Sequence, residues 1–101
     1  MFEKIKQLRN LRDQAKRMQD ELAQITVNAE GLGGKISVVM DGNQKIMALD
    51  ISPELLETSK KEVLEKAIAE TINQTVKKAQ IEAAKKMQSL GGLAGLNMPG
   101  F

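Results

Sequence analysis

An uninterrupted helical pattern over residues 59–90 constrains this 101-residue chain more than any other feature. Ser59-Lys60-Lys61-Glu62 has the form of a capping box, which predicts the start of the helix. Gly91-Gly92 predicts its end. Such a helix is about 45 Å long at about 1.5 Å per residue, whereas a compact domain of this size has a radius of gyration of about 13 Å. The helix therefore extends beyond any globule that the rest of the chain could build.

Both predicted long helices carry a narrow apolar stripe. In the first, over residues 2–24, apolar residues recur at alternating spacings of 3 and 4, a heptad pattern: Leu8, Leu11, Ala15, Met18, Leu22 and Ile25. In the last, they follow an eleven-residue repeat, which predicts a nearly straight helix: Ile68, Ile72, Val76, Ala79, Ala83, Met87 and Leu90. A small sheet cannot cover both stripes. Either the helices project as a pair or a second chain covers them, and we expect a homodimer.

The segment between the helices alternates apolar and polar residues, the period of half-buried strands. We expect strands near residues 25–30, 36–40 and 47–51, with a glycine-rich break at 31–34 and a hairpin turn at 41–43. Ser52-Pro53 predicts a short helical turn capped by the Ser52 hydroxyl. The fold class is therefore α+β, with a long N-terminal helix, a three-stranded antiparallel meander, a short helical turn and a long C-terminal helix. Residues 1–90 form one domain, and residues 91–101 are expected to be a flexible glycine-rich tail.

The inventory of side chains argues against catalysis and metal binding. The chain has no Cys and no His, so thiolate sites and the commonest general base and metal ligand are excluded. Gly31-Leu32-Gly33-Gly34-Lys35 is not a phosphate-binding loop, because Ala29 and Ile36 occupy positions that the motif reserves for Gly and for Ser or Thr. We expect no catalytic residue, no metal and no cofactor. Four methionines, Met18, Met40, Met47 and Met87, are interpreted as core filler.

Two further classes are disfavoured by composition. The two aromatic residues, Phe2 and Phe101, lie at the chain ends, which argues against a single-strand reader with aromatic stacking platforms. The longest apolar run is Ile46–Leu49, so no segment is expected to span a membrane, and we expect a soluble, cytoplasmic protein. Carboxylates such as Glu62, Glu65 and Glu70 are interpreted as a solvated helix face.

The net charge is only +2, but the charges are segregated. Residues 1–17 carry six basic and two acidic side chains, net +4, and residues 77–86 carry four Lys and one Glu, net +3. If the helices are antiparallel, both basic segments converge at one distal end, a shape suited to phosphate binding. The candidate DNA-binding residues are Arg9, Arg12, Lys16, Arg17, Lys77, Lys78, Lys85 and Lys86.

The order of these features resembles the YbaB/EbfC family of bacterial nucleoid-associated proteins. The resemblance rests on Gln14–Gln19, Gly31–Gly34, Asp41–Asn43, Asp50–Leu56, Ile72–Gln74, Lys77–Ala79, Lys86–Met87 and Leu96–Phe101. It covers almost the full length and implies a tweezer-like homodimer that binds duplex DNA in the nucleoid, with varying sequence preference and no enzymatic activity. The chain departs from the family at Gly34-Lys35, where an apolar pair often follows the glycines.

Three function classes stay open at this point. The first is a homodimeric nucleoid-associated protein that binds duplex DNA through basic helical arms, in chromosome organisation or gene regulation, with no membrane or small-molecule partner. The second is a protein-interaction scaffold or assembly factor without direct DNA contact. The third, a small acid–base enzyme, is disfavoured by the inventory of side chains.

Overall fold

The computed structural model describes the backbone of residues 2–94 and the side chains of residues 2–90. The elements are α1 (Phe2–Ala23), β1 (Thr26–Gly31), β2 (Ile36–Asp41), β3 (Ile46–Ile51) and α2 (Lys61–Ala94). Short 3₁₀ turns occupy Leu32–Gly34, Pro53–Leu55 and Thr58–Lys60. This arrangement confirms the predicted α+β fold class, from the long first helix to the long last one.

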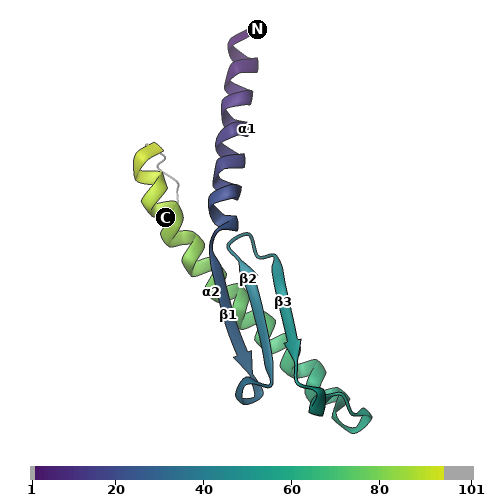
Figure 1. Cartoon of the computed structure of the whole chain (residues 1–101). Helices are drawn as coiled ribbons and strands as arrows, with labels where there is room; N and C mark the ends of the chain where they lie inside the picture. The colour runs from purple at the N-terminus through teal and green to yellow at the C-terminus, as the bar shows by residue number, and fades with distance from the viewer. Residues whose placement is uncertain (1, 95–101) are drawn as a thin grey trace.

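The molecule is elongated, with a radius of gyration of 18.6 Å and extents of 64 × 24 × 20 Å. Figure 1 shows α2 running diagonally across one face of the sheet, while α1 projects from the end of the sheet near the β2–β3 turn. Both helices extend beyond the sheet in the same general direction, but they diverge from each other (Figure 1). The two long helices therefore do not project as a closely packed pair within one chain.

The sheet is the predicted antiparallel meander, with strand order β1-β2-β3. Alternate β2 residues, Ile36, Val38 and Met40, are buried. Ile36 pairs with Ile51 and Val38 with Leu49, but a register shift then sets Met40 opposite Ile46. β3 shows no alternation of burial: its residues from Ile46 to Asp50 are all exposed, and Met47 is 57% exposed. Met40 is core filler as predicted, whereas that interpretation of Met47 is wrong.

Small residues of α2 pack against the sheet. Ala67, Thr71, Thr75 and Ala79 are buried at intervals of one helical turn. The Thr71 hydroxyl donates to the Ala67 carbonyl at 2.6 Å, and the Thr75 hydroxyl donates to the Thr71 carbonyl at 2.6 Å. Since these donors are satisfied within the helix, their burial leaves no polar atom unpaired. The predicted stripe is thus shifted: Ala79 lies at the contact, whereas Ile68, Ile72 and Val76 flank it and are only half-buried.

Both predicted ends of the last helix are wrong. A 3₁₀ turn at Thr58–Lys60 leads directly into α2, and the extended residue before this turn is Glu57. Ser59 therefore lies inside a helical turn, where its backbone is not in the extended conformation of a capping residue. At the other end, α2 continues through Gly91 and Gly92 to Ala94, because glycine permits a helix stop without imposing one. The predicted tail from residue 95 onward lies outside the described residues.

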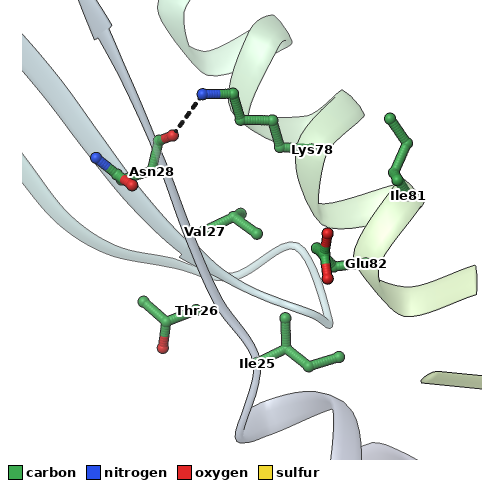
Figure 2. Close-up of a pocket in the computed structure, with 7 residues that line it drawn as sticks. All are labelled: Ile25, Thr26, Val27, Asn28, Lys78, Ile81 and Glu82. Atoms are coloured by element: carbon green, nitrogen blue, oxygen red, sulfur yellow. Dashed lines mark hydrogen bonds between the residues drawn. The ribbon is translucent and has the colours of Figure 1, made fainter. Parts of the chain in front are cut away.

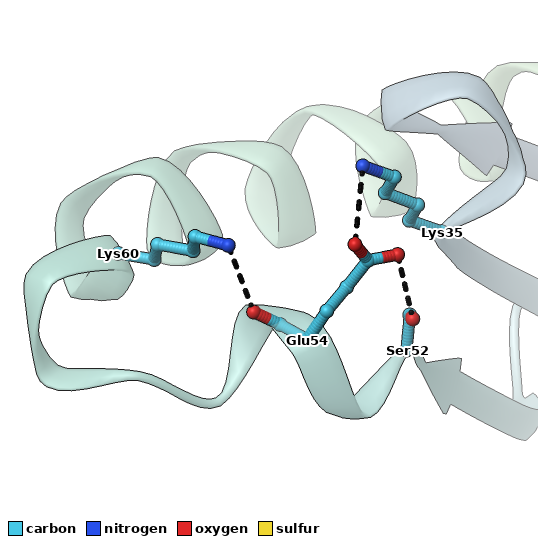
Figure 3. Close-up of polar contacts among 4 residues, drawn as sticks. All are labelled: Lys35, Ser52, Glu54 and Lys60. Carbon is cyan, nitrogen blue, oxygen red and sulfur yellow. Dashed lines mark hydrogen bonds and ion pairs between the residues drawn. The ribbon is translucent and has the colours of Figure 1, made fainter.

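The turn at Pro53–Leu55 begins with Pro53 in the first helical position, as predicted. The Ser52 hydroxyl does not cap the backbone of that turn; instead it donates to the Glu54 carboxylate at 3.2 Å. Figure 3 shows the same carboxylate beside the Lys35 ammonium, at an N–O distance of 3.5 Å. The predicted hydroxyl cap is therefore wrong, because the neighbouring carboxylate is the acceptor that Ser52 uses.

Candidate nucleic-acid interface

Helix α1 is exposed over most of its length. No residue of Phe2–Ala23 is buried, and the side chains of Leu8 and Leu11 are 67% and 63% exposed. We call Leu8, Leu11, Ala15, Met18 and Leu22 the α1 seam. Only its last members, Met18 and Leu22, are half-buried, where α1 joins the body. The outer members of the seam, Leu8, Leu11 and Ala15, thus have no cover among the described residues.

Basic side chains lie beside the α1 seam. Arg9, Arg12 and Lys16 are spaced by three and four residues, so they share one helix face, and Arg17 follows directly. All four are exposed, and no ion pair joins any of them to an acid among residues 2–94. Because none of them is held in an ion pair within the described chain, these side chains are available to an external anion.

The basic residues of α2 have a different setting. Lys78 lies over the sheet and donates to the Asn28 carbonyl at 2.9 Å, in the hollow between β1 and α2 shown in Figure 2. Lys85 pairs with Glu82 at 3.4 Å. Lys86 crosses to α1 and pairs with Glu21 at 3.2 Å. Lys77 is exposed, and no ion pair of the described residues includes it.

The two basic groups therefore do not converge at one distal end, as the antiparallel arrangement had predicted. Lys78 and Lys86 lie beside the sheet and at the base of α1. Arg9 is twelve residues before Glu21, which places it about 18 Å farther out along α1 at about 1.5 Å per residue. Since α1 and α2 diverge beyond the sheet (Figure 1), the bases of α1 and those of α2 form two separate groups.

The base of α1 is held by the β2–β3 turn. Leu22 accepts the Gly42 backbone N–H at 2.9 Å, and the Gln19 carbonyl accepts the Asn43 side-chain amide at 3.0 Å. The sequence correctly predicted a turn at Asp41-Gly42-Asn43 but not its contact with α1. A turn motif specifies local backbone geometry and carries no signal for a helix end twenty residues earlier.

Lys60 and Lys61 lie at the opposite pole, where α2 begins. Lys60 donates to the Glu54 carbonyl at 3.0 Å, as Figure 3 shows, and Lys61 pairs with Glu65 at 3.2 Å. Their neighbours are acidic, so they serve as a natural control for the bases of α1.

Within residues 2–94 there is no group of three or more carboxylates placed to hold a metal ion. No helix of this part of the chain is both long and apolar enough to cross a bilayer.

These features describe a small α+β protein with an exposed basic helical arm, a class suited to binding an extended polyanion. The sequence model of the YbaB/EbfC DNA-binding family matches residues 1–94, and the chain belongs to this family. The resemblance seen in the order of the sequence motifs is thereby confirmed.

Relatives carry matching names. A nucleoid-associated protein of Syntrophobacter fumaroxidans is 34% identical over 100 residues, covering 99% of this chain and 89% of the relative. One of Thermoanaerobacter pseudethanolicus is 33% identical over 97 residues, covering 96% and 86%. The crystal structure of an uncharacterized Helicobacter pylori protein has a TM-score of 0.61 at 20% identity, covering 82% of this chain and 94% of that one. That structural likeness shows a shared fold.

Proposed function

We propose that this protein binds duplex DNA as a homodimer, through basic residues on its helical arms and with weak sequence selectivity. The observation that carries the proposal is the exposed α1 helix, in which an uncovered apolar seam runs beside a row of unneutralised bases. An uncovered apolar seam favours a partner that buries it, and a row of exposed bases favours an anionic ligand. The name that the relatives carry, nucleoid-associated protein, supports DNA as that anion and supports a location on the nucleoid, in the cytoplasm.

A second copy of the chain is the partner that the apolar surface favours. Besides the α1 seam, the β3 side chains Ile46 and Leu49 are 44% and 46% exposed, on an edge strand. Half-buried Ile72 and Val76 of α2 add to the apolar surface. Monomeric proteins seldom expose large contiguous apolar patches, and open strand edges invite pairing.

Binding would be dominated by phosphate contacts. Arg9, Arg12 and Lys16 form a row along one helix face, which suits the regular spacing of backbone charges. Sequence is read by hydrogen bonds to base edges, whereas phosphate contacts carry no direct sequence information. Binding that rests on a row of phosphate contacts therefore favours weak selectivity.

The test is duplex affinity at several salt concentrations, using unrelated DNA sequences. For the wild type, log affinity should fall linearly with log salt, with a slope of about −0.9 per phosphate contact. Arg9→Ala with Arg12→Ala should weaken binding on every duplex and make the slope shallower by about 1 for each phosphate contact that is lost. The matched control is Lys60→Ala with Lys61→Ala, which should leave both affinity and slope nearly unchanged. If the control pair weakens binding as much as the arginine pair, the arm is not the DNA site.

The second candidate is a scaffold that holds a partner protein, which the exposed α1 seam also favours. It predicts no duplex binding at low salt and a loss of partner binding when the seam, and not the basic row, is changed. The same titration separates the two candidates.

A further inference from the structure

We infer that the β2–β3 turn is a joint that fixes the direction of α1, so that Gly42 and Asn43 act in DNA binding without touching DNA. The part of this inference that concerns DNA binding rests on the proposed function. We call this joint the arm joint: the turn Asp41–Asn43 together with residues Gln19–Ile25, which comprise the end of α1 and the two residues after it.

The last turn of any α-helix leaves four carbonyl groups without partners inside the helix. In α1 one of these carbonyls, that of Leu22, accepts the Gly42 N–H from the turn as well as the Ile25 N–H at 3.1 Å. The Gln19 carbonyl, just before the last four, accepts the Asn43 side-chain amide. Donors at a helix C-terminus also complement the negative end of the helix dipole. The last turn of α1 contains no basic residue of its own. The hydrogen-bond donors that complement this end of the helix come instead from the β2–β3 turn.

The turn is itself rigidly built. One oxygen of the buried Asp41 carboxylate accepts the backbone N–H groups of Asn43 at 2.9 Å and Lys45 at 3.0 Å. The Asp41 N–H donates to the Lys45 carbonyl at 2.9 Å, which closes the hairpin. Because Asp41 ends β2, the donors that reach α1 are fixed relative to the sheet.

Gly42 allows the close approach of α1 to the turn. A methyl group placed at Gly42 would lie 2.5 Å from the Leu22 carbonyl oxygen and 3.2 Å from the Ile25 side chain. Gly42 is not among the residues with positive φ, so alanine fits the backbone of the turn. Alanine here is therefore a specific probe, because the obstacle it meets is the end of α1.

A second contact acts on the same segment from the other side. Glu21 pairs with Lys86 of α2 at 3.2 Å, so the base of α1 is held both by the turn and by the long helix. Beyond this base, α1 has no buried residue to hold it. The arm joint therefore decides where Arg9 and Arg12 lie relative to α2 in the free protein.

The inference predicts two separable effects. Asn43→Ala removes one donor and loosens α1, so binding must first order the arm. The affinity for duplex DNA should fall by about threefold to tenfold, the weight of one hydrogen bond, at every salt concentration. The salt slope should stay unchanged, since no phosphate contact is lost. Gly42→Ala should instead turn α1 to a new direction.

The experiment measures the distance between α1 and α2 by pulsed electron paramagnetic resonance. The chain contains no Cys, so spin labels can be placed specifically at Gln7→Cys and Gln88→Cys, both exposed positions. Labelled protein is diluted into an excess of unlabelled protein so that distances within one chain dominate. Duplex affinity is then titrated against salt with the same unlabelled variants.

Two controls separate positioning from general destabilisation. Asn73→Ala removes an exposed amide of α2 that makes no side-chain hydrogen bond to a described residue. Ile36→Val removes a buried methylene at the far end of the sheet and lowers stability without touching the arm joint. Both should leave the distance distribution and the duplex affinity unchanged.

The expected result is a broadened distribution for Asn43→Ala, a shifted one for Gly42→Ala, and weaker duplex binding for both. Unchanged distributions in both variants would overturn the inference. Altered distributions with wild-type duplex affinity would also overturn it, while the proposed function would stand. If the wild type itself fails to bind duplex DNA, the proposed function fails, and the distances still decide whether the turn directs α1.

Discussion

The two long helices of this protein differ in how far their own chain buries their side chains. Helix α2 lays Ala67, Thr71, Thr75 and Ala79 against the sheet and buries all four, whereas α1 buries none of its 22 residues. Yet α1 has the more regular apolar pattern. The difference teaches that periodicity shows that a helix has an apolar face, but not which chain covers it. Close packing within the chain depends on small residues that let α2 approach the strands.

The largest effect expected from this difference is on stability. Met40→Ala removes a side chain that is 1% exposed, beneath α2, and should lower the free energy of unfolding by about 2–5 kcal/mol. Leu11→Ala on α1 should change it little at concentrations where the protein is a monomer, since Leu11 is 63% exposed in the single chain. Denaturant titration measures both. Equal losses would show that α1 packs on its own chain.

Dimerisation, unlike the stability of the single chain, should depend strongly on the apolar residues of α1. Leu8→Gln with Leu11→Gln removes two leucines from the proposed dimer interface, and burial of each contributes about 1.5–3 kcal/mol. The dimer dissociation constant should therefore rise more than about tenfold, as measured by equilibrium sedimentation. Leu56→Gln, a leucine 66% exposed at the opposite pole, is the control. A double variant that dimerises like the wild type would mean that the seam is covered by something else.

A smaller effect separates the bases of the two helices. Lys78→Ala with Lys85→Ala should weaken duplex binding and lower the salt slope, but by less than Arg9→Ala with Arg12→Ala. The reason is that Lys78 and Lys85 already have partners in their own chain, Asn28 and Glu82. Salt titrations of the two double variants in parallel provide the comparison. A larger loss from the lysine pair would place the main DNA contact beside the sheet.

The smallest expected effect is that of the ion pair between the helices. Glu21→Gln leaves Lys86 without its carboxylate, but both side chains are more than a third exposed. Such pairs contribute at most about 1 kcal/mol, so the melting temperature should change by no more than a few degrees for a domain of this size. A large drop in a thermal melt would mean that this pair, and not the turn, holds α1.

Much of the fold was predictable from the sequence because local patterns specify local structure. Alternation in Ile36, Val38 and Met40 predicted a buried strand face, and Asp41-Gly42-Asn43 predicted the hairpin. The ends of α2 were predicted wrongly because Ser59 and Gly91 permit a helix boundary without requiring one. The buried face of α2 was misplaced by one residue, since Thr71 and Thr75 satisfy their hydroxyl groups within the helix and so pack as small residues.

The candidate site was predictable in composition but not in geometry. Charge counting identified the bases of α1 and α2, and these remain predicted DNA contacts. Their separation could not be predicted, because it depends on the angle between α1 and the sheet. That angle is set by contacts of Gly42 and Asn43 with Leu22 and Gln19, which are distant in sequence and follow no periodic pattern.

The most direct test of the central claim, that a second copy and not its own chain covers α1, is amide hydrogen exchange measured against protein concentration. Most helical stability in proteins comes from tertiary packing of an amphipathic face, so α1 amides should exchange fast well below the dimer dissociation constant and slowly well above it. Amides of β2 and of the α2 segment Ala67–Ala79 should stay protected in both conditions, because their cover lies within the chain. Protection of α1 that does not change with concentration would contradict the account.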